Sequence, residues 1–251
     1  MPADVTAVQT NRRGLELFRN YQRTGNSQLL QEAVAFFREA TDATPAGHVH
    51  RPAYLKNLGI ALMARFERTG QQADLDQAVT RLTEALGATP ARHPDRPGML
   101  SSLGNAVRMR SDRTRQPADL ERAIALHTEA LGATPAGHPS RPGYLSNLGN
   151  ALGTRFWRTR QRADLDQAIV VFGEAVDATP PGDPERPQFL AGLGHALEAR
   201  FELTGQLADL DRIIALFREA VDATPAGHPH RPRHQSDLDL ALRIRRERTG
   251  R

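Results

Sequence analysis

The sequence predicts an all-α protein built from repeated pairs of antiparallel helices. A Thr-Pro dipeptide recurs every 45 residues, beginning at Thr44, Thr89, Thr134, Thr179 and Thr224. An Arg-Pro dipeptide recurs with the same period, beginning at Arg51, Arg96, Arg141, Arg186 and Arg231. Between these dipeptides the apolar residues lie three or four positions apart, which is the spacing of one helix face. A fixed period of this length indicates stacked helical repeats.

Each repeat is expected to contain two helices. In the second repeat, the segments YLKNLGIALMARF (from Tyr54) and LDQAVTRLTEAL (from Leu75) each carry an apolar stripe. We predict a single array over residues 1–251 that ends in a solvating helix at 231–251, because Gln235 and Asp239 replace a leucine and a glycine there. The preceding repeats are predicted at 6–50, 51–95, 96–140, 141–185 and 186–230.

The first helix of each repeat is expected to begin at the Arg-Pro dipeptide, because the first helical turn does not need the N–H that proline lacks. Asp95 and Ser140 stand just before it as candidate caps. The helix should end at a glycine in the left-handed conformation, at Gly25, Gly70, Gly205 or Gly250. Arg115 and Arg160 replace this glycine in two repeats and should make weaker caps.

The second helix of each repeat is expected to begin at an aspartate and to end at the Thr-Pro dipeptide. The aspartates predicted as N-caps are Asp74, Asp119, Asp164 and Asp209. Further acid in the first turn would favour the helix dipole.

A glycine recurs inside the first helix, where it should cost up to about 1 kcal/mol relative to alanine. The glycines are Gly14, Gly59, Gly104, Gly149 and Gly194. We predict that this position faces a small residue of the second helix, so that the two backbones approach closely. The facing residues are expected to be Ala33, Ala78, Ala123 and Ala168, with Ile213 as the departure in the fifth repeat.

These spacings resemble the tetratricopeptide repeat (TPR), at positions Leu58, Gly59, Leu62, Ala78, Leu82, Ala85 and Pro90. The resemblance implies a right-handed α-solenoid whose concave groove is lined by the first helices. The 45-residue version, with seven extra residues between Gly59 and Ala78, is similar to repeats that precede CHAT (caspase-like protease) domains in actinobacterial and fungal proteins. The protease activity does not extend to this chain, because the sequence has no cysteine.

Composition and motifs argue against several classes of function. The absence of cysteine removes thiol nucleophiles and thiolate metal ligands. No stretch of 18 apolar residues and no phosphate-binding or serine-nucleophile motif occurs, so we expect a cytoplasmic protein that is no enzyme, uses no cofactor and binds no membrane.

Two repeated patterns invite a metal interpretation. The joint histidines are His48, His93, His138 and His228, and the aspartate pairs begin at Asp74, Asp164 and Asp209. Histidines one repeat apart cannot converge on one ion, because packed helices stand about 10 Å apart. We interpret the histidines as polar joint residues and the aspartates as helix caps, and predict no metal site.

The resemblance also places candidate partner-binding residues on the groove face of the first helices. They are Lys56, Asn57, Ile60, Asn105, Arg108, Asn147, Asn150, His195 and Glu198. Amides can hold a peptide backbone and cations can hold its terminal carboxylate, although a merely solvated polar face fits equally well. Trp157 stands where other repeats have acidic residues, so it is either a partner anchor or a packing residue.

Arginine dominates the positive charge, since Lys56 is the sole lysine and the net charge is +4. A ladder of arginines near the end of the first helices comprises Arg65, Arg110, Arg155, Arg200 and Arg245. We favour pairing with the acids that begin the second helices over an anion-binding strip.

The sequence therefore predicts a protein-interaction scaffold that binds a peptide or protein segment in its groove. The first alternative is a regulatory or sensor arm of a CHAT-type protease or signalling system. The second is arginine-mediated nucleic-acid binding, which salt-dependent retention on DNA or RNA would reveal.

Overall fold

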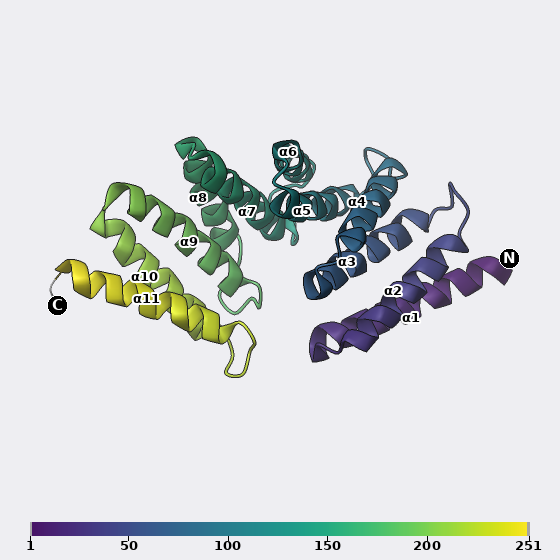
Figure 1. The fold of residues 1–251 in the computed structure, drawn as a ribbon, viewed down its shortest axis with the longest axis horizontal. Coiled ribbons are helices and arrows are strands. Elements are labelled where there is room, and N and C mark those ends of the chain that lie inside the picture. Colours follow the sequence, from purple (N-terminus) through teal and green to yellow (C-terminus); the bar gives the residue numbers. More distant parts are fainter. Residues whose placement is uncertain (1, 250–251) are drawn as a thin grey trace. The chain divides into compact units, whose positions relative to one another are not determined.

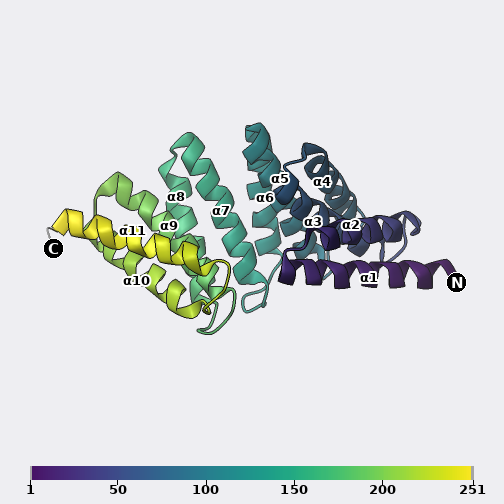
Figure 2. The same cartoon turned by 60° about the horizontal axis from the view of Figure 1, so that its bottom comes forward.

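The computed structural model describes residues 2–249, and every regular element in that range is an α-helix (Figure 1). The helices are α1 (Pro2–Thr24), α2 (Ser27–Asp42), α3 (Arg51–Thr69), α4 (Gln72–Gly87), α5 (Arg96–Thr114), α6 (Pro117–Gly132), α7 (Arg141–Thr159), α8 (Arg162–Asp177), α9 (Arg186–Thr204), α10 (Leu207–Ala223) and α11 (Arg231–Thr249). Each odd-numbered helix pairs antiparallel with the even-numbered helix that follows it, up to α10 (Figure 2). The predicted all-α fold of helix pairs is confirmed.

The chain forms two compact units, one up to Ala130 and the other from Leu131. The first unit holds α1 to α5 and most of α6, and the second holds α7 to α11. Within each unit, a second helix packs both on its own partner and on the first helix of the next repeat, as α2 does on α1 and α3. No helix in the described range is long and apolar enough to cross a membrane.

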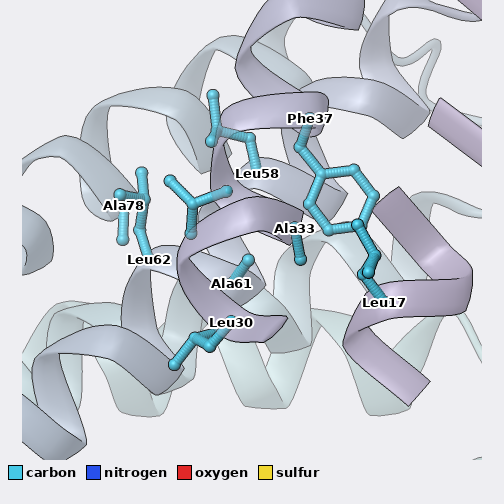
Figure 3. Packing of buried hydrophobic residues seen from close by; sticks show 9 residues of the cluster. Leu17, Leu30, Ala33, Phe37, Leu58, Ala61, Leu62 and Ala78 are labelled. Atoms are coloured by element: carbon cyan, nitrogen blue, oxygen red, sulfur yellow. The ribbon is translucent and has the colours of Figure 1, made fainter. Parts of the chain in front are cut away.

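One cluster of the core of the first unit lies mainly between α1, α2 and α3, with Ala78 added from α4 (Figure 3). Leu17, Leu30, Phe37, Leu58 and Leu62 are all at least 96% buried there. Ala33, Ala61 and Ala78 fill the narrower spaces between the helix backbones. Small and large side chains thus alternate where three helices meet.

The glycine inside each first helix accommodates a large side chain of the second helix. A Cβ at Gly149 would lie 2.6 Å from the ring of Phe172, and one at Gly59 would lie 2.6 Å from Leu82. The corresponding residues in the other repeats are Phe37, His127 and Phe217. The expected alanine partners were wrong, because a bulky side chain fills the space that each glycine leaves. The close approach of the two backbones stays a prediction. The facing side chain is the bulky one a turn further along the second helix.

The arginine of each Arg-Pro dipeptide caps the preceding second helix. Nη1 of Arg141 donates to the backbone oxygens of Leu131 and Thr134, at 3.0 and 2.7 Å. Arg51, Arg96, Arg186 and Arg231 make the same pair of contacts in their joints. The carbonyl of Leu131 also accepts the backbone N–H of Thr134, so the guanidinium adds a second hydrogen bond there and caps the carbonyl of Thr134 as well.

The joint histidines stabilise the turn between repeats. Nδ1 of His138 accepts a hydrogen bond from the backbone N–H of Ser140 at 3.1 Å. In the next joint, Oδ1 of Asp183 accepts from the N–H of Glu185 in the same way, at 2.8 Å. The joint histidines therefore act as polar joint residues, as predicted, by accepting a backbone N–H two residues further along the chain. Ser140 occupies the predicted cap position, but its side chain makes no capping bond.

The predicted aspartate N-caps were wrong. The second helices begin two residues earlier, after glutamines such as Gln71 and Gln161, so Asp74 and Asp164 lie in the first turn. Their carboxylates are almost fully buried and instead receive the arginine ladder. Nε and Nη2 of Arg65 bind the two carboxylate oxygens of Asp74 at 2.8 and 2.5 Å.

The same two-pronged pair joins Arg110 to Asp119, Arg155 to Asp164, and Arg200 to Asp209. The hydrogen bonding of Arg110 to the Asp119 carboxylate, in which the guanidinium donates, raises the pKa of Arg110. The predicted pairing with the acids that begin the second helices is thus present in four repeats, and it engages these arginines inside the protein.

The left-handed caps at the ends of the first helices occur where they were predicted. Gly70 and Gly205 have φ angles of 67° and 65°, and Arg115 and Arg160 adopt the same conformation at 60° and 58°. Gly250 lies outside the described residues.

Replacing Arg115 with glycine should raise the free energy of unfolding of the first unit by about 1 kcal/mol, because glycine adopts positive φ without a Cβ penalty. Urea unfolding of the variant beside Gly70→Ala measures this, and the second variant should lose a similar amount. An unchanged midpoint for both variants would contradict the expected cost.

Candidate functional site

The second unit carries a pocket of about 220 Å³ between α7, α8 and α9. Its lining includes Asn150, Trp157 and His195, which are three of the predicted partner-binding residues. Phe156 and Phe172 add aromatic surface, and Ala196 and Ala199 add small apolar side chains from α9. The pocket is mostly apolar, with an amide and an imidazole at its edge. That combination is typical of sites that bind a side chain and orient the backbone next to it.

Two glycines of the pocket lining have different surroundings, and only one of them leaves open space. Gly192 on α9 lies against the Phe172 ring, where a Cβ would come within 2.5 Å of a ring carbon. Gly153 on α7 has no atom within 4 Å of its ideal Cβ position, so its missing side chain leaves open space. One repeat earlier and one repeat later, the position of Gly153 holds Arg108 and Glu198. The pocket therefore exists because long side chains are replaced at this one point in the repeat.

Trp157 forms one wall of the pocket and remains 50% exposed. Its ring packs edge-on against Phe156, with centroids 5.4 Å apart. The guanidinium of Arg160 lies 4.5 Å from the indole centroid, at cation–π distance. Both predicted roles are compatible with this geometry, since packing fixes the indole while half of its surface stays available.

His195 links the pocket to an acidic group on the neighbouring helix. Its Nε2 lies 3.2 Å from Oδ2 of Asp237 on α11, and its ring contacts Phe217. Burial lowers the pKa of His195, while the Asp237 carboxylate opposes that shift. Glu198 lies one turn further along α9. Burial, Asp237 and Glu202 together raise the pKa of Glu198 to about 7.

The predicted residues of the first unit occupy α3 and α5. Nδ2 of Asn57 donates to Oδ1 of Asn11 at 3.0 Å, and Nη1 of Arg108 lies 2.8 Å from Oδ2 of Asp112. Lys56, Ile60 and Asn105 are half-buried on the same helices. Asn57 and Arg108 thus already have partners within the protein. A terminal carboxylate of a bound peptide would have to displace Asn11 and Asp112 to bind them.

Sequence reasoning identified Asn150, Trp157 and His195 but missed Gly153, Gly192 and Asp237. Asn147 is half-buried on α7 and is not part of the pocket lining given above. Aligning the repeats position by position would have marked Gly153, because a helix interior disfavours glycine unless the space has a use.

Helices with a 45-residue period, joined by repeated Thr-Pro and Arg-Pro turns, define a helical repeat protein. The family model of the tetratricopeptide repeat matches residues 53–95. That match covers one repeat, and the fold of the described residues is the fold of solved tetratricopeptide repeat proteins. No curated protein matches the sequence.

Three solved structures illustrate the likeness of fold. A thermophilic TPR protein from Thermus thermophilus has a TM-score of 0.65 and 16% identity over 92% of this chain and 98% of that chain. The nearly identical TPR-like repeats of a Podosopora anserina protein have a TM-score of 0.58 and 19% identity, over 82% of this chain and 93% of that chain. The apo form of the quorum sensor NprR from B. thuringiensis has a TM-score of 0.61 and 13% identity, over 96% of this chain and 59% of that chain.

Proposed function

We propose that this protein is an interaction scaffold that binds a peptide or protein segment on the face of its first helices. The pocket around Gly153 is the anchoring point, and Asn150, Trp157 and His195 contact the bound segment. Within the second unit, Asn147 and Glu198 are further polar residues of the proposed binding face. The first unit is proposed to present a binding face of its own, with Lys56, Asn57, Asn105 and Arg108 as its polar residues and Ile60 as an apolar one.

The observation that carries the proposal is a preformed pocket with open space at Gly153, walled by a half-exposed tryptophan. Helical repeat proteins use such surfaces for binding, and partially exposed tryptophans are frequent anchors of protein interfaces. A rigid pocket also lowers the ordering cost on the scaffold side.

The arrangement of the arginines argues against the nucleic-acid alternative. Four arginines of the ladder bind buried or partly buried aspartates, and those of the Arg-Pro dipeptides bind helix carbonyls. Phosphate binding needs cations that are accessible at the surface. A regulatory or sensor arm of a CHAT-type protease or signalling system would also bind its ligand on the face of the first helices and would differ only in the protein that it regulates.

Replacing Gly153 with methionine should abolish binding without harming the fold. Open space surrounds the glycine Cβ position, so the new side chain fills the pocket, and the helix gains up to about 1 kcal/mol. Gly173→Met is the matched control, because Gly173 lies inside α8 with equally open space and is not among the pocket residues.

A phage-displayed library of random dodecapeptides selected on the full wild-type chain supplies the ligands. Synthetic, tryptophan-free versions are then titrated while the emission of Trp157, the only tryptophan, is followed. We expect selected peptides to bind wild type and Gly173→Met alike and to bind Gly153→Met at least about tenfold more weakly, which is about 1.4 kcal/mol. Equal binding to all three proteins would refute the proposal.

A further inference from the structure

Resting on the proposed function, we infer that the segment bound at the Gly153 pocket is basic: an apolar side chain enters the pocket, and a lysine or arginine close to it in sequence pairs with Glu198 and Asp237. The apolar pocket alone does not determine the charge of the partner, whereas the acidic residues beside it favour a basic one. Three features carry it: an unbalanced acidic group, its position beside the pocket, and the contrast with the first unit.

The acidic group consists of Glu198 and Glu202 on α9 and Asp237 on α11. The charged neighbours that shift the pKa of Glu198 are both carboxylates, Asp237 and Glu202, and both raise it. Glu198 is thus a half-buried carboxyl group with two further carboxylates close enough to disfavour its ionisation. A cation placed among them would remove that repulsion and form charge-assisted hydrogen bonds.

The corresponding position in the first unit already contains its own cation. Arg108 occupies the position of Glu198, and its Nη1 lies 2.8 Å from Oδ2 of Asp112. The same guanidinium lowers the pKa of Glu67, which is the repeat equivalent of Glu202, against the raising effect of burial. The second unit places Glu198 where that arginine would be, so a bound segment has to supply the positive charge.

The side chain of His195 lies between the acidic group and the pocket. His195 lines the pocket, and its Nε2 lies 3.2 Å from Asp237. Successive residues of an extended peptide are about 3.3 Å apart. An anchor in the pocket therefore brings a basic residue one to three positions away within reach of Glu198 and Asp237.

The other charged and titratable groups around this site set its expected pH dependence. They are Glu202 on α9 and Arg233 and His234 on α11, together with His195 and Asp237. The pKa values of both histidines are lowered, so their neutral forms are favoured. Glu198, with a pKa of about 7, ionises between about pH 6 and pH 8. A basic segment should therefore bind more tightly at pH 8 than at pH 6.

The selected dodecapeptides test this inference separately from the proposed function. Peptides that lose binding to Gly153→Met should carry lysine or arginine within three positions of an apolar residue. The double variant Glu198→Gln with Asp237→Asn should weaken them about tenfold at pH 8. A synthetic peptide that keeps the apolar anchor residue but has serine in place of its basic residues should bind the double variant and the wild type with the same affinity.

Three outcomes overturn the inference. Enrichment of acidic or uncharged peptides that still depend on Gly153 would leave the scaffold proposal intact and refute the basic partner. Basic peptides that bind the double variant as tightly as wild type would also refute it. Peptides insensitive to Gly153→Met would refute both proposals together.

Discussion

Replacing Arg65 with alanine is expected to lower the free energy of unfolding of the first unit by about 3–5 kcal/mol. The side chain of Asp74 is only 3% exposed, and Arg65 binds both of its carboxylate oxygens. Removal of the guanidinium leaves a charge in the core with neither a counter-ion nor water. Chemical denaturation of the variant and the wild type at pH 7.5 measures the loss.

Two further variants establish the cause. Arg13 forms an ion pair with Glu16 whose side chains are 59% and 51% exposed, so Arg13→Ala should cost less than about 1 kcal/mol. The double variant Arg65→Met with Asp74→Leu should recover most of the loss, because no charge is left unpaired. If Arg65→Ala unfolds at the same denaturant concentration as Arg13→Ala, the buried pair does not stabilise the unit.

The same ion pair explains why one part of the fold could not be predicted from the sequence. Asp74 follows a loop and precedes an apolar run, which is the local pattern of an N-cap. Its actual role depends on Arg65, nine residues earlier on the other helix of the pair. Local pattern gave the correct helices and turn positions, whereas the partner of a buried charge is decided by packing between helices.

The period of the sequence was enough to predict the helix pairs, the Arg-Pro starts and the left-handed ends. These features depend on residues a few positions apart, such as Gly70 with its positive φ. The glycine inside the first helix was correctly interpreted as a position where packing against the second helix requires a missing side chain. The identity of the facing residue, for example Phe172 opposite Gly149, was missed because it depends on the rotation of one helix against another.

The candidate site was predictable only in part, because a pocket is defined by side chains that are missing. Asn150, Trp157 and His195 attract attention as polar or aromatic residues on the first-helix face. Gly153 carries no functional group, yet it leaves the open space that those residues surround, and Gly192 makes room for the Phe172 ring that forms another wall. The acidic partner of His195 lies on the next repeat, at Asp237, and only the packing of α9 on α11 brings it close.

Acidification should destabilise the first unit through His127. This residue occupies the core position that holds Leu82 in the preceding repeat and lies fully buried against Gly104. Within the described residues, neither of its ring nitrogens has a hydrogen-bond partner. Burial, with a smaller effect of the Arg108 charge, lowers the pKa of His127 from 6.5 to about 4.

The direction of the effect follows from the two pKa values. Above pH 6.5, His127 is neutral in both the folded and the unfolded chain, so it makes no pH-dependent contribution. Between pH 6.5 and about 4, the unfolded chain takes up a proton that the folded chain does not, and stability falls as the pH falls. The full loss corresponds to about 3 kcal/mol.

His127→Leu isolates this contribution, because leucine is the residue of the preceding repeat and every other titrating group stays the same. The variant should be about 1–3 kcal/mol more stable at pH 7.5, since two unpaired buried nitrogens are removed. The advantage should grow by about 3 kcal/mol between pH 7.5 and pH 4. Urea unfolding across this range measures it, and parallel stability curves for the two proteins would show that His127 titrates normally and is not buried as a neutral ring.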